Sequence, residues 1–301
     1  MRNFIGYDEL INNFKIRCSS GNISHAHLIS GNDGSGKSIL AKLFAKFIIN
    51  KNLDKEYVDI IDYEPKKTSF GVDEVREIID EVNKKPFEGD KKVIIIHQGN
   101  KLTIQAQNAL LKTIEEPPKG VYIILLCESL ELILDTIKSR CEIYKLTPLT
   151  KEQLYDYIKI KEYNHTDAEL KAAIAFSEGI PGKIDRYFKD DGLKELRAKV
   201  IKILNCIVKN DVEFVLQCEE EFLEYKDDKE EVLNIITLFV RDILLHKEVD
   251  NQEIIINGDK INDIKELTKE MSFKKLNGII KKIEEARKNI RSNVSWPMIL
   301  R

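Results

Sequence analysis

A phosphate-binding pattern near the N-terminus constrains this chain more than any other feature. The pattern G-x-x-x-x-G-K-S/T is matched by eight consecutive residues: Gly31, Asn32, Asp33, Gly34, Ser35, Gly36, Lys37 and Ser38. Apolar residues that end at Ser30 predict a strand before this loop, and residues 38–49 predict a helix after it. In such a setting, backbone N–H groups cradle phosphates, Lys37 reaches the β- and γ-phosphates, and the Ser38 hydroxyl ligates Mg²⁺. The sequence therefore predicts a site for ATP or ADP with Mg²⁺.

The acids that would complete this site are missing where they are expected. Hydrolysis requires one carboxylate that secures the metal and another that orients the attacking water. Residues 93–96 predict the buried strand that should end in these acids, but His97 and Gln98 follow it. An amide cannot take a proton from water, and imidazole is a poor ligand for Mg²⁺. We interpret His97 as a hydrogen-bonded structural residue, and we predict a degenerate site that holds a nucleotide without hydrolysing it well.

Composition limits the class of protein. With 301 residues, of which 43% are hydrophobic and 33% charged, the chain is long enough for two or three globular domains. A formal net charge of −3 argues against a strongly basic nucleic-acid-binding protein. No C-x-x-C pair occurs among the cysteines, so neither a zinc site nor disulfides are expected from Cys18, Cys127, Cys141, Cys206 and Cys218. The sequence has no signal peptide and no long apolar run, which predicts a cytoplasmic protein.

Strands and helices alternate in the first half of the chain. Short apolar runs predict five strands, over residues 27–30, 58–61, 93–96, 122–127 and 143–146. Helical spacing of apolar residues is found between them, over residues 38–49, 72–83 and 104–116. This alternation is typical of right-handed βαβ crossovers. It predicts a doubly wound α/β domain with a parallel sheet.

After residue 148 the pattern becomes helical throughout. Two pairs match the capping box and predict the starts of two helices: Thr150 with Gln153, and Thr166 with Glu169. Glycine and proline at residues 179–182 predict a break, and nearly all apolar positions beyond residue 193 have helical spacing. We therefore predict an α/β plus all-α fold in three domains: a P-loop nucleotide-binding domain (1–148), a small helical domain (149–190) and a C-terminal helical domain (191–301).

Three further strings indicate a family. Ser-His-Ala-His begins at Ser24, Asn-Ala-Leu-Leu-Lys-Thr-Ile-Glu-Glu-Pro-Pro occupies residues 108–118, and Ser-Arg-Cys is centred on Arg140. On these strings the chain resembles the clamp-loader branch of the AAA+ ATPases, and within that branch the delta-prime subunits of bacterial DNA polymerase III. The resemblance is close over residues 1–147, and beyond about residue 190 it depends on architecture alone. It implies a P-loop AAA+ parallel-sheet domain, a small helical lid domain and a C-terminal helical collar domain for oligomerisation.

The resemblance also implies roles for individual residues. Arg140 would act in trans as an arginine finger on the γ-phosphate bound by a neighbouring subunit; the alternative is a surface arginine in a structural ion pair. Lys183 falls near the lid position of a nucleotide-sensing arginine, although lysine lacks the fork that grips two oxygens. Arg76 and Thr103, near the starts of two helices, are candidates for contact with the DNA backbone. Residues 50–56 replace the four-cysteine zinc module of many relatives, so no zinc is expected.

The sequence thus predicts a non-motor, delta-prime-like subunit of the DNA polymerase III clamp loader, part of the polymerase holoenzyme but itself without ATPase activity. Its implied partners are gamma/tau-type and delta-type subunits and, through the complex, the sliding clamp and primer-template DNA. It would work at the nucleoid, and no membrane partner is expected. Two alternatives remain open. One is a motor, either gamma/tau-like or an autonomous AAA+ ATPase of replication or recombination, and the other is a scaffold whose phosphate loop is empty.

Overall fold

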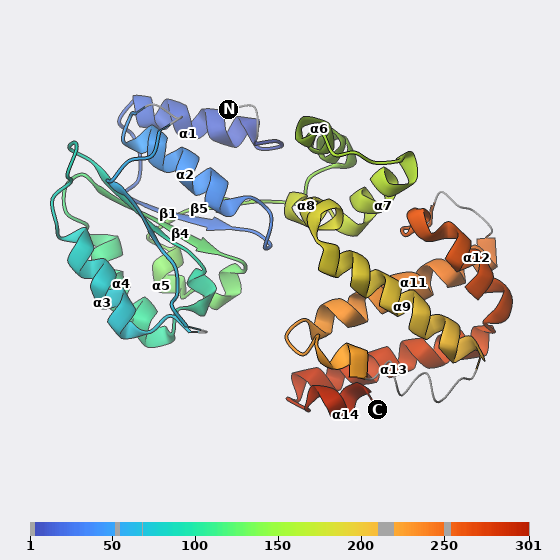
Figure 1. Ribbon diagram of the computed structural model, residues 1–301. Helices are drawn as coiled ribbons and strands as arrows, with labels where there is room; N and C mark the ends of the chain where they lie inside the picture. The colour runs from blue at the N-terminus through green and yellow to red at the C-terminus, as the bar shows by residue number, and fades with distance from the viewer. Residues whose placement is uncertain (1–3, 52–54, 68, 210–219, 250–253, 301) are drawn as a thin grey trace. The chain divides into compact units, whose positions relative to one another are not determined.

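The structure is a computed structural model that describes residues 4–51, 55–67, 69–209, 220–249 and 254–300. The chain forms two compact units, whose elements are labelled in Figure 1. The first unit contains Met1–Lys161 and Gly179–Gly182, and the second contains Glu162–Glu178 and Lys183–Arg301. The three domains expected from the sequence remain a prediction.

The first unit is built on a parallel sheet of five strands in the order β2-β3-β4-β1-β5. The strands are β1 (Ala26–Ser30), β2 (Ile60–Tyr63), β3 (Lys92–Ile96), β4 (Val121–Cys127) and β5 (Glu142–Lys145). All residues of β1 and β3 are buried, as is usual where helices cover both faces of a parallel sheet. The predicted parallel sheet is confirmed. Only β2 lies two residues later than expected, because Val58 is exposed and Ile60 is the first residue to pair with β3.

Helices cover the two faces of this sheet (Figure 1). The helices on one face are α1 (Asp8–Ser19) and α2 (Lys37–Ile48), and those on the other are α3 (Val72–Val82), α4 (Ile104–Glu115) and the short α5 (Asp135–Lys138). The unit also contains α6 (Lys151–Lys161) and the 3-10 turns η1 (Gly99–Lys101) and η2 (Leu130–Leu132). The three predicted helices correspond to α2, α3 and α4. Helix α1 was not predicted, because Ile11 and Phe14 are its only buried residues and its apolar periodicity is weak.

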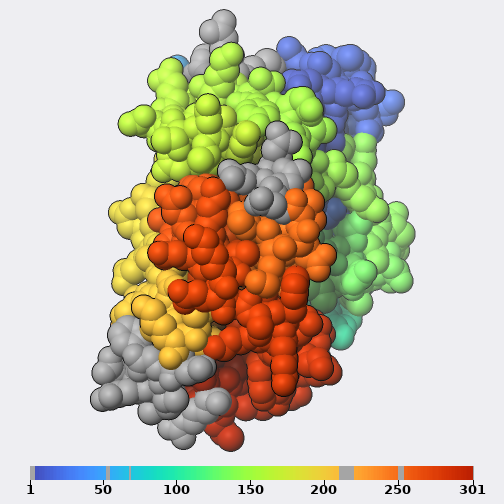
Figure 2. Space-filling model, turned by 90° about the vertical axis from the view of Figure 1, so that its right-hand side faces the viewer, coloured from blue at the N-terminus to red at the C-terminus, as the bar shows by residue number. Residues whose placement is uncertain are grey.

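Within its described residues, the second unit contains helices and the loops that join them. Its elements are α7 (Asp167–Ser177), α8 (Pro181–Lys189, whose first two residues belong to the first unit), α9 (Asp191–Lys209), α11 (Lys229–Val249), η4 (Gly258–Lys260), α12 (Ile261–Glu270), α13 (Phe273–Arg291) and α14 (Trp296–Leu300). Helix α11 packs against both α12 and α13, and these helices form adjoining orange-to-red parts of the surface in Figure 2. Leu196, Phe239 and Leu276, from α9, α11 and α13, meet in one apolar core.

Both predicted capping boxes are present. Thr166 Oγ1 accepts a hydrogen bond from the N–H of Glu169 at 3.2 Å, and the Glu169 carboxylate accepts one from the N–H of Thr166 at 2.8 Å. Thr150 and Gln153 exchange the same two bonds, at 3.3 and 2.9 Å. Such reciprocal bonds satisfy N–H groups that have no acceptor within the helix. The predicted break also occurs, because α7 ends at Ser177 and α8 begins at Pro181.

Two searches of the described residues limit what else the fold contains. None of their helices combines the length and the apolar composition that crossing a lipid bilayer requires. Within the same residues, no group of three or more histidine, cysteine, aspartate or glutamate side chains is arranged to hold a metal ion. Cys218, and residues 52–54 of the segment that replaces the zinc module, lie outside the described residues.

Candidate functional site

The phosphate-binding loop connects β1 to α2. The N–H of Gly31 donates to the carbonyl oxygen of Cys127 at 3.2 Å, which ties the start of the loop to β4. Gly36 has a φ of +93° at the N-cap of α2, and a Cβ there would lie 2.7 Å from the ring of Phe4. Glycine alone fits this conformation and this contact. The first N–H groups of α2 have no acceptor within the helix, so the loop presents donors to a phosphate.

Lys37 lies across this loop. Its Nζ donates to the carbonyl oxygens of Gly31 at 2.7 Å and Asn32 at 2.9 Å. Burial lowers the pKa of Lys37, and the nearby Asp33 opposes this effect. Two weak acceptors hold the ammonium, and a phosphate oxygen would be a stronger partner because it carries a full charge. The local chemistry is therefore suited to the predicted role.

The loop also contacts the start of α8. The N–H of Gly182 donates to the carbonyl oxygen of Gly34 at 2.9 Å, and a Cβ on Gly182 would lie 2.6 Å from the Cα of Gly34. The two backbones can approach this closely only because both residues are glycines. Lys183 is the next residue, and its ammonium forms an ion pair with Glu178. The nucleotide contact of Lys183 stays a prediction, and it would require this exposed ion pair to open.

The end of the third strand lies beside Ser38. His97 directly follows β3 and is 8% exposed. Its Nε2 lies 2.7 Å from Asp62 Oδ1, and its Nδ1 lies 3.4 Å from Ser38 Oγ. His97 is therefore buried and hydrogen-bonded, and its role as a structural residue stays a prediction. Gln98 is exposed, has a φ of +50° and precedes η1.

Asp62 is the site residue that the sequence analysis missed. It lies in β2, next to β3, where it is in register with Ile95. Its second carboxylate oxygen is 3.6 Å from the ammonium of Lys42 on α2. Parallel strands bring their carboxyl ends to one edge of the sheet, which is where ligands of open α/β sheets bind. The available signal was an aspartate directly after the predicted second strand, at the same edge as His97.

Arg140 is held at a separate, exposed corner of the first unit. Its Nη2 donates to Glu115 Oε1 at 3.2 Å, and its Nε lies 3.1 Å from Glu115 Oε2. Its Nη1 donates to the carbonyl oxygen of Thr136 in α5 at 3.0 Å. The two side chains of the ion pair are 34% and 53% exposed. Because Glu115 belongs to the string of residues 108–118, two of the three strings that indicate the family meet at this ion pair.

The two candidate DNA contacts are engaged within their own helices. Arg76 of α3 forms an exposed ion pair with Asp73 at 2.9 Å. Thr103 is the N-cap of α4, and its hydroxyl accepts a hydrogen bond from the N–H of Ala106 at 3.2 Å. An N-cap hydroxyl keeps its own hydrogen for a second partner. Contact of either residue with DNA stays a prediction.

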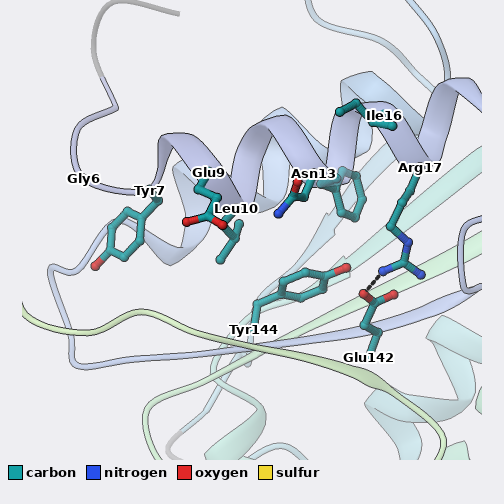
Figure 3. A pocket seen from close by; sticks show the side chains of 10 residues that line it. Gly6, Tyr7, Glu9, Leu10, Asn13, Ile16, Arg17, Glu142 and Tyr144 are labelled. Carbon is teal, nitrogen blue, oxygen red and sulfur yellow. Dashed lines mark hydrogen bonds and ion pairs between the residues drawn. The ribbon is translucent and has the colours of Figure 1, made fainter.

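A pocket of about 710 Å³ lies between α1 and β5 (Figure 3). Its lining includes Tyr7 and Asn13 on the helix side and Tyr144 on the strand, but no residue of the phosphate-binding loop. Arg17 and Glu142 form an ion pair across one side of it. Burial, reinforced by Glu142, raises the pKa of Tyr144, so the phenol is neutral at physiological pH. This pocket is separate from the predicted nucleotide site.

The fold and the site define a P-loop protein of the AAA+ type in which His97 and Gln98 occupy the positions of the third-strand acids. A family model described as DNA polymerase III, delta subunit, matches residues 6–150. A second model, described as DNA polymerase III, delta subunit, C terminal, matches residues 192–298. The chain therefore belongs to the clamp-loader subunits of DNA polymerase III.

Known relatives show which group of subunits it is similar to. The chain is 28% identical to DNA polymerase III subunit delta' of Bacillus subtilis (strain 168) over 291 residues, which are 91% of this chain and 87% of that protein. It is 33% identical to subunit gamma of Buchnera aphidicola subsp. Acyrthosiphon pisum over 194 residues, 58% of this chain and only 54% of that relative. The predicted delta-prime-like identity is confirmed.

A solved structure agrees with the fold. It is a DNA polymerase III gamma subunit-related protein from Thermotoga maritima, with a TM-score of 0.54 and 19% sequence identity. The match covers 91% of this chain and 98% of that one. At this identity the likeness shows the fold alone, and it supports the predicted combination of a parallel α/β sheet with a helical C-terminal part.

Proposed function

We propose that this delta-prime-like subunit is a non-motor member of the clamp loader and gives Arg140 to an ATP site on a neighbouring subunit. The observation that carries the proposal is the partly exposed guanidinium of Arg140, which lies against both oxygens of Glu115. A guanidinium is permanently charged and grips two phosphate oxygens at once. The chain's own P-loop, by contrast, faces His97 where a motor would place a carboxylate.

The P-loop would hold ATP or ADP as a structural ligand. The left-handed Gly36, the bridging ammonium of Lys37 and the start of α2 support phosphate binding. A divalent ion would lie beside the Ser38 hydroxyl. Mg²⁺ prefers oxygen ligands in octahedral geometry, and the imidazole of His97 is the group that faces this hydroxyl. The residues present therefore fit Mg²⁺ poorly, which is consistent with a site that binds but does not hydrolyse.

The partners follow from the family. Gamma/tau-type and delta-type subunits would assemble with this chain through the C-terminal helices of the second unit. The sliding clamp and primer-template DNA would be reached through the complex, with Arg76 and Thr103 as candidate backbone contacts. The complex would act in the cytoplasm, at the nucleoid.

ATP turnover by the isolated chain is the first test. We expect turnover no higher than that of a Lys37→Ala variant, because His97 and Gln98 replace the acids after the third strand that secure the metal and orient water. Hydrolysis at the rate of a motor, abolished by Lys37→Ala, would contradict the proposal and favour the gamma/tau-like alternative. Self-assembly of the pure chain into a ring with ATP would favour an autonomous AAA+ ATPase.

The second test places Arg140→Ala in a reconstituted clamp loader. Hydrolysis at the ATP site that Arg140 faces should slow by roughly 10³-fold or more, the usual contribution of an arginine finger. Single-turnover kinetics would resolve this as the loss of one phase. Lys138→Ala is the matched control, because it removes a nearby cation that pairs with Asp135. If the Arg140→Ala loader has wild-type kinetics, the proposed role in trans is wrong, and Arg140 serves only in a structural ion pair.

A further inference from the structure

The imidazole of His97 is held in one orientation. A carboxylate only accepts hydrogen bonds, so the 2.7 Å contact with Asp62 places the hydrogen of the neutral imidazole on Nε2. Asp62 is itself kept in place by the ammonium of Lys42 at 3.6 Å. The other ring nitrogen, Nδ1, then carries a lone pair, which faces Ser38 Oγ. This is the pattern by which an outer carboxylate orients a histidine that ligates a metal.

Nδ1 lies next to the Ser38 hydroxyl, which is the group that ligates the divalent ion in a P-loop. Two ligand atoms 3.4 Å apart can each lie about 2.1 Å from one ion, at an angle of about 108°, near the tetrahedral value. Glu64, which follows β2, is exposed, and its Oε1 is 3.9 Å from the same nitrogen. Ser38 Oγ and Glu64 Oε1 therefore both lie within 4 Å of Nδ1, and phosphate oxygens of a nucleotide would complete the set.

The donor set selects among ions. Mg²⁺ takes oxygen ligands and gains little from imidazole, whereas Mn²⁺, Co²⁺ and Zn²⁺ accept a mixture of nitrogen and oxygen. Within the described residues, fewer than three histidine, cysteine, aspartate or glutamate side chains meet in any one arrangement that could hold a metal. An ion at His97 would consequently need the nucleotide for tight binding, and the nucleotide would need the ion.

We propose that a nucleotide in this P-loop is held together with a divalent transition-metal ion, ligated by His97 Nδ1 and Ser38 Oγ, with Glu64 in reach and Asp62 as the positioning residue. The inference rests on the nucleotide binding in the proposed function and specifies its metal. The chain would thus keep a nucleotide–metal complex as a fixed part of its fold, at the position where a motor subunit holds Mg²⁺ for hydrolysis.

The test measures binding of the fluorescent analogue mant-ATP to the whole chain with EDTA, Mg²⁺, Mn²⁺ or Co²⁺. We expect affinity with Mn²⁺ or Co²⁺ to exceed that with Mg²⁺ by roughly tenfold or more. His97→Asp should remove this preference, because it offers Mg²⁺ the carboxylate that it prefers. Asp62→Asn leaves His97 in place but should weaken binding with Mn²⁺ by about 10–100-fold, as expected for loss of an orienting partner.

A spectroscopic measurement separates ligation from indirect effects. Pulsed EPR of the Mn²⁺–ATP complex should show coupling to an imidazole nitrogen, which is lost in His97→Asp. Glu77→Gln is the control for removal of a carboxylate, because Glu77 pairs with Lys66 on the exposed side of α3. This variant should keep both the nitrogen coupling and the preference for Mn²⁺. Circular dichroism establishes that each variant is folded.

The outcomes distinguish the inference from the function beneath it. If mant-ATP binds equally well with Mg²⁺, Mn²⁺ and EDTA and no nitrogen coupling is seen, the metal assignment is wrong and nucleotide binding stands. If the folded wild-type chain binds mant-ATP under none of these conditions, nucleotide binding fails and the metal assignment fails with it. In that case the role of Arg140 in trans is untouched, since the reconstituted loader tests it separately.

Discussion

Two arginines, one in each unit, are each paired with both oxygens of one carboxylate but differ in burial. Arg140 in the first unit and Arg197 in the second each meet both oxygens of one carboxylate, Glu115 and Asp259 respectively. The Arg140 pair lies at the surface, whereas Arg197 is 7% exposed and also donates to Asn257 at 3.0 Å. Arg197 is held among buried partners, whereas the partly exposed Arg140 is paired with Glu115 and donates to the carbonyl oxygen of Thr136.

The difference shows how burial distinguishes a charge that stabilises the fold from one that can bind a partner outside the chain. Removing one partner of a buried ion pair leaves an unpaired charge in a medium of low dielectric constant, which is costly. An exposed pair is weak because water and salt screen it. An arginine that must reach a neighbouring subunit can therefore be held by an ion pair at the surface, but not by an ion pair in the core.

Replacing Arg140 with lysine should give the largest effect, and it tests whether the surface arginine acts on hydrolysis and not on stability. Lysine keeps the charge but presents a point ammonium in place of a planar fork. We expect most of the roughly 10³-fold contribution of a finger, about 4 kcal/mol of the barrier, to be lost in the reconstituted loader. The free energy of unfolding of the isolated chain should change by less than about 0.5 kcal/mol, as at most exposed sites. Single-turnover hydrolysis and urea titration measure the two effects, and a fully active lysine variant would show that charge alone suffices.

Arg197→Ala, in contrast to the Arg140 variant, should have its main effect on stability. Loss of this buried partner of Asp259 is expected to lower the free energy of unfolding by about 3–5 kcal/mol. Urea titration followed by circular dichroism would measure it. Arg186→Ala is the matched control in the same unit, because Arg186 pairs with Glu231 at a more exposed position and should cost about 1 kcal/mol or less. If the two variants lose the same free energy of unfolding, burial does not determine how much an ion pair contributes to stability.

Most of the sheet could be predicted because its strands are buried on both faces. Residues 93–96 and 122–127 are continuous apolar runs, and both lie within observed strands. Helix α1 could not be predicted in this way, because its outer face is polar and few of its residues are buried. The shift in β2 has a related cause: this strand lies at the edge of the sheet and is only partly buried, so its pattern is weaker.

The candidate site was predictable only where it is local in sequence. The phosphate-binding loop and the substitution at His97 can be read from short strings. Asp62 lies 35 residues from its partner, and the order of strands in the sheet, which the sequence did not reveal, brings the two together. The strings that contain Glu115 and Arg140 were both recognised, but their ion pair joins residues 25 apart and depends on how α4 and α5 pack.

A buried histidine in the first unit tests whether burial also makes an ionisable group there matter for stability. His27 in β1 is fully buried against the rings of Phe14 and Tyr144, and burial lowers its pKa to about 4. The unfolded chain binds a proton here below about pH 6.5, so between that pH and about 4 it binds more protons than the folded chain. Stability should therefore fall with falling pH in this window, by about 2 kcal/mol from pH 7 to pH 5.

The measurement is the pH dependence of the urea midpoint. His27→Leu should remove this part of the slope, although Glu142 and Arg17, whose charges also act on His27, remain. Ile29→Val, at another fully buried position of β1, supplies the control, because it changes the packing without removing a titratable group and should leave the slope unchanged. If the wild type and His27→Leu have the same slope, burial of His27 does not contribute to the pH dependence of stability.

Glu115→Gln should give the smallest effect, and it probes what holds Arg140 in place. Glutamine keeps one oxygen that can accept from the guanidinium but removes the charge, and an exposed ion pair is worth about 0.2–1 kcal/mol. The free energy of unfolding should change within that range, and hydrolysis at the site facing Arg140 should slow by no more than about fivefold. Glu116→Gln, at the next exposed position, is the control. If hydrolysis slowed as much as in Arg140→Ala, Glu115 would itself be part of the ATP site. Removal of a carboxylate that only orients Arg140 cannot slow hydrolysis as much as removal of Arg140.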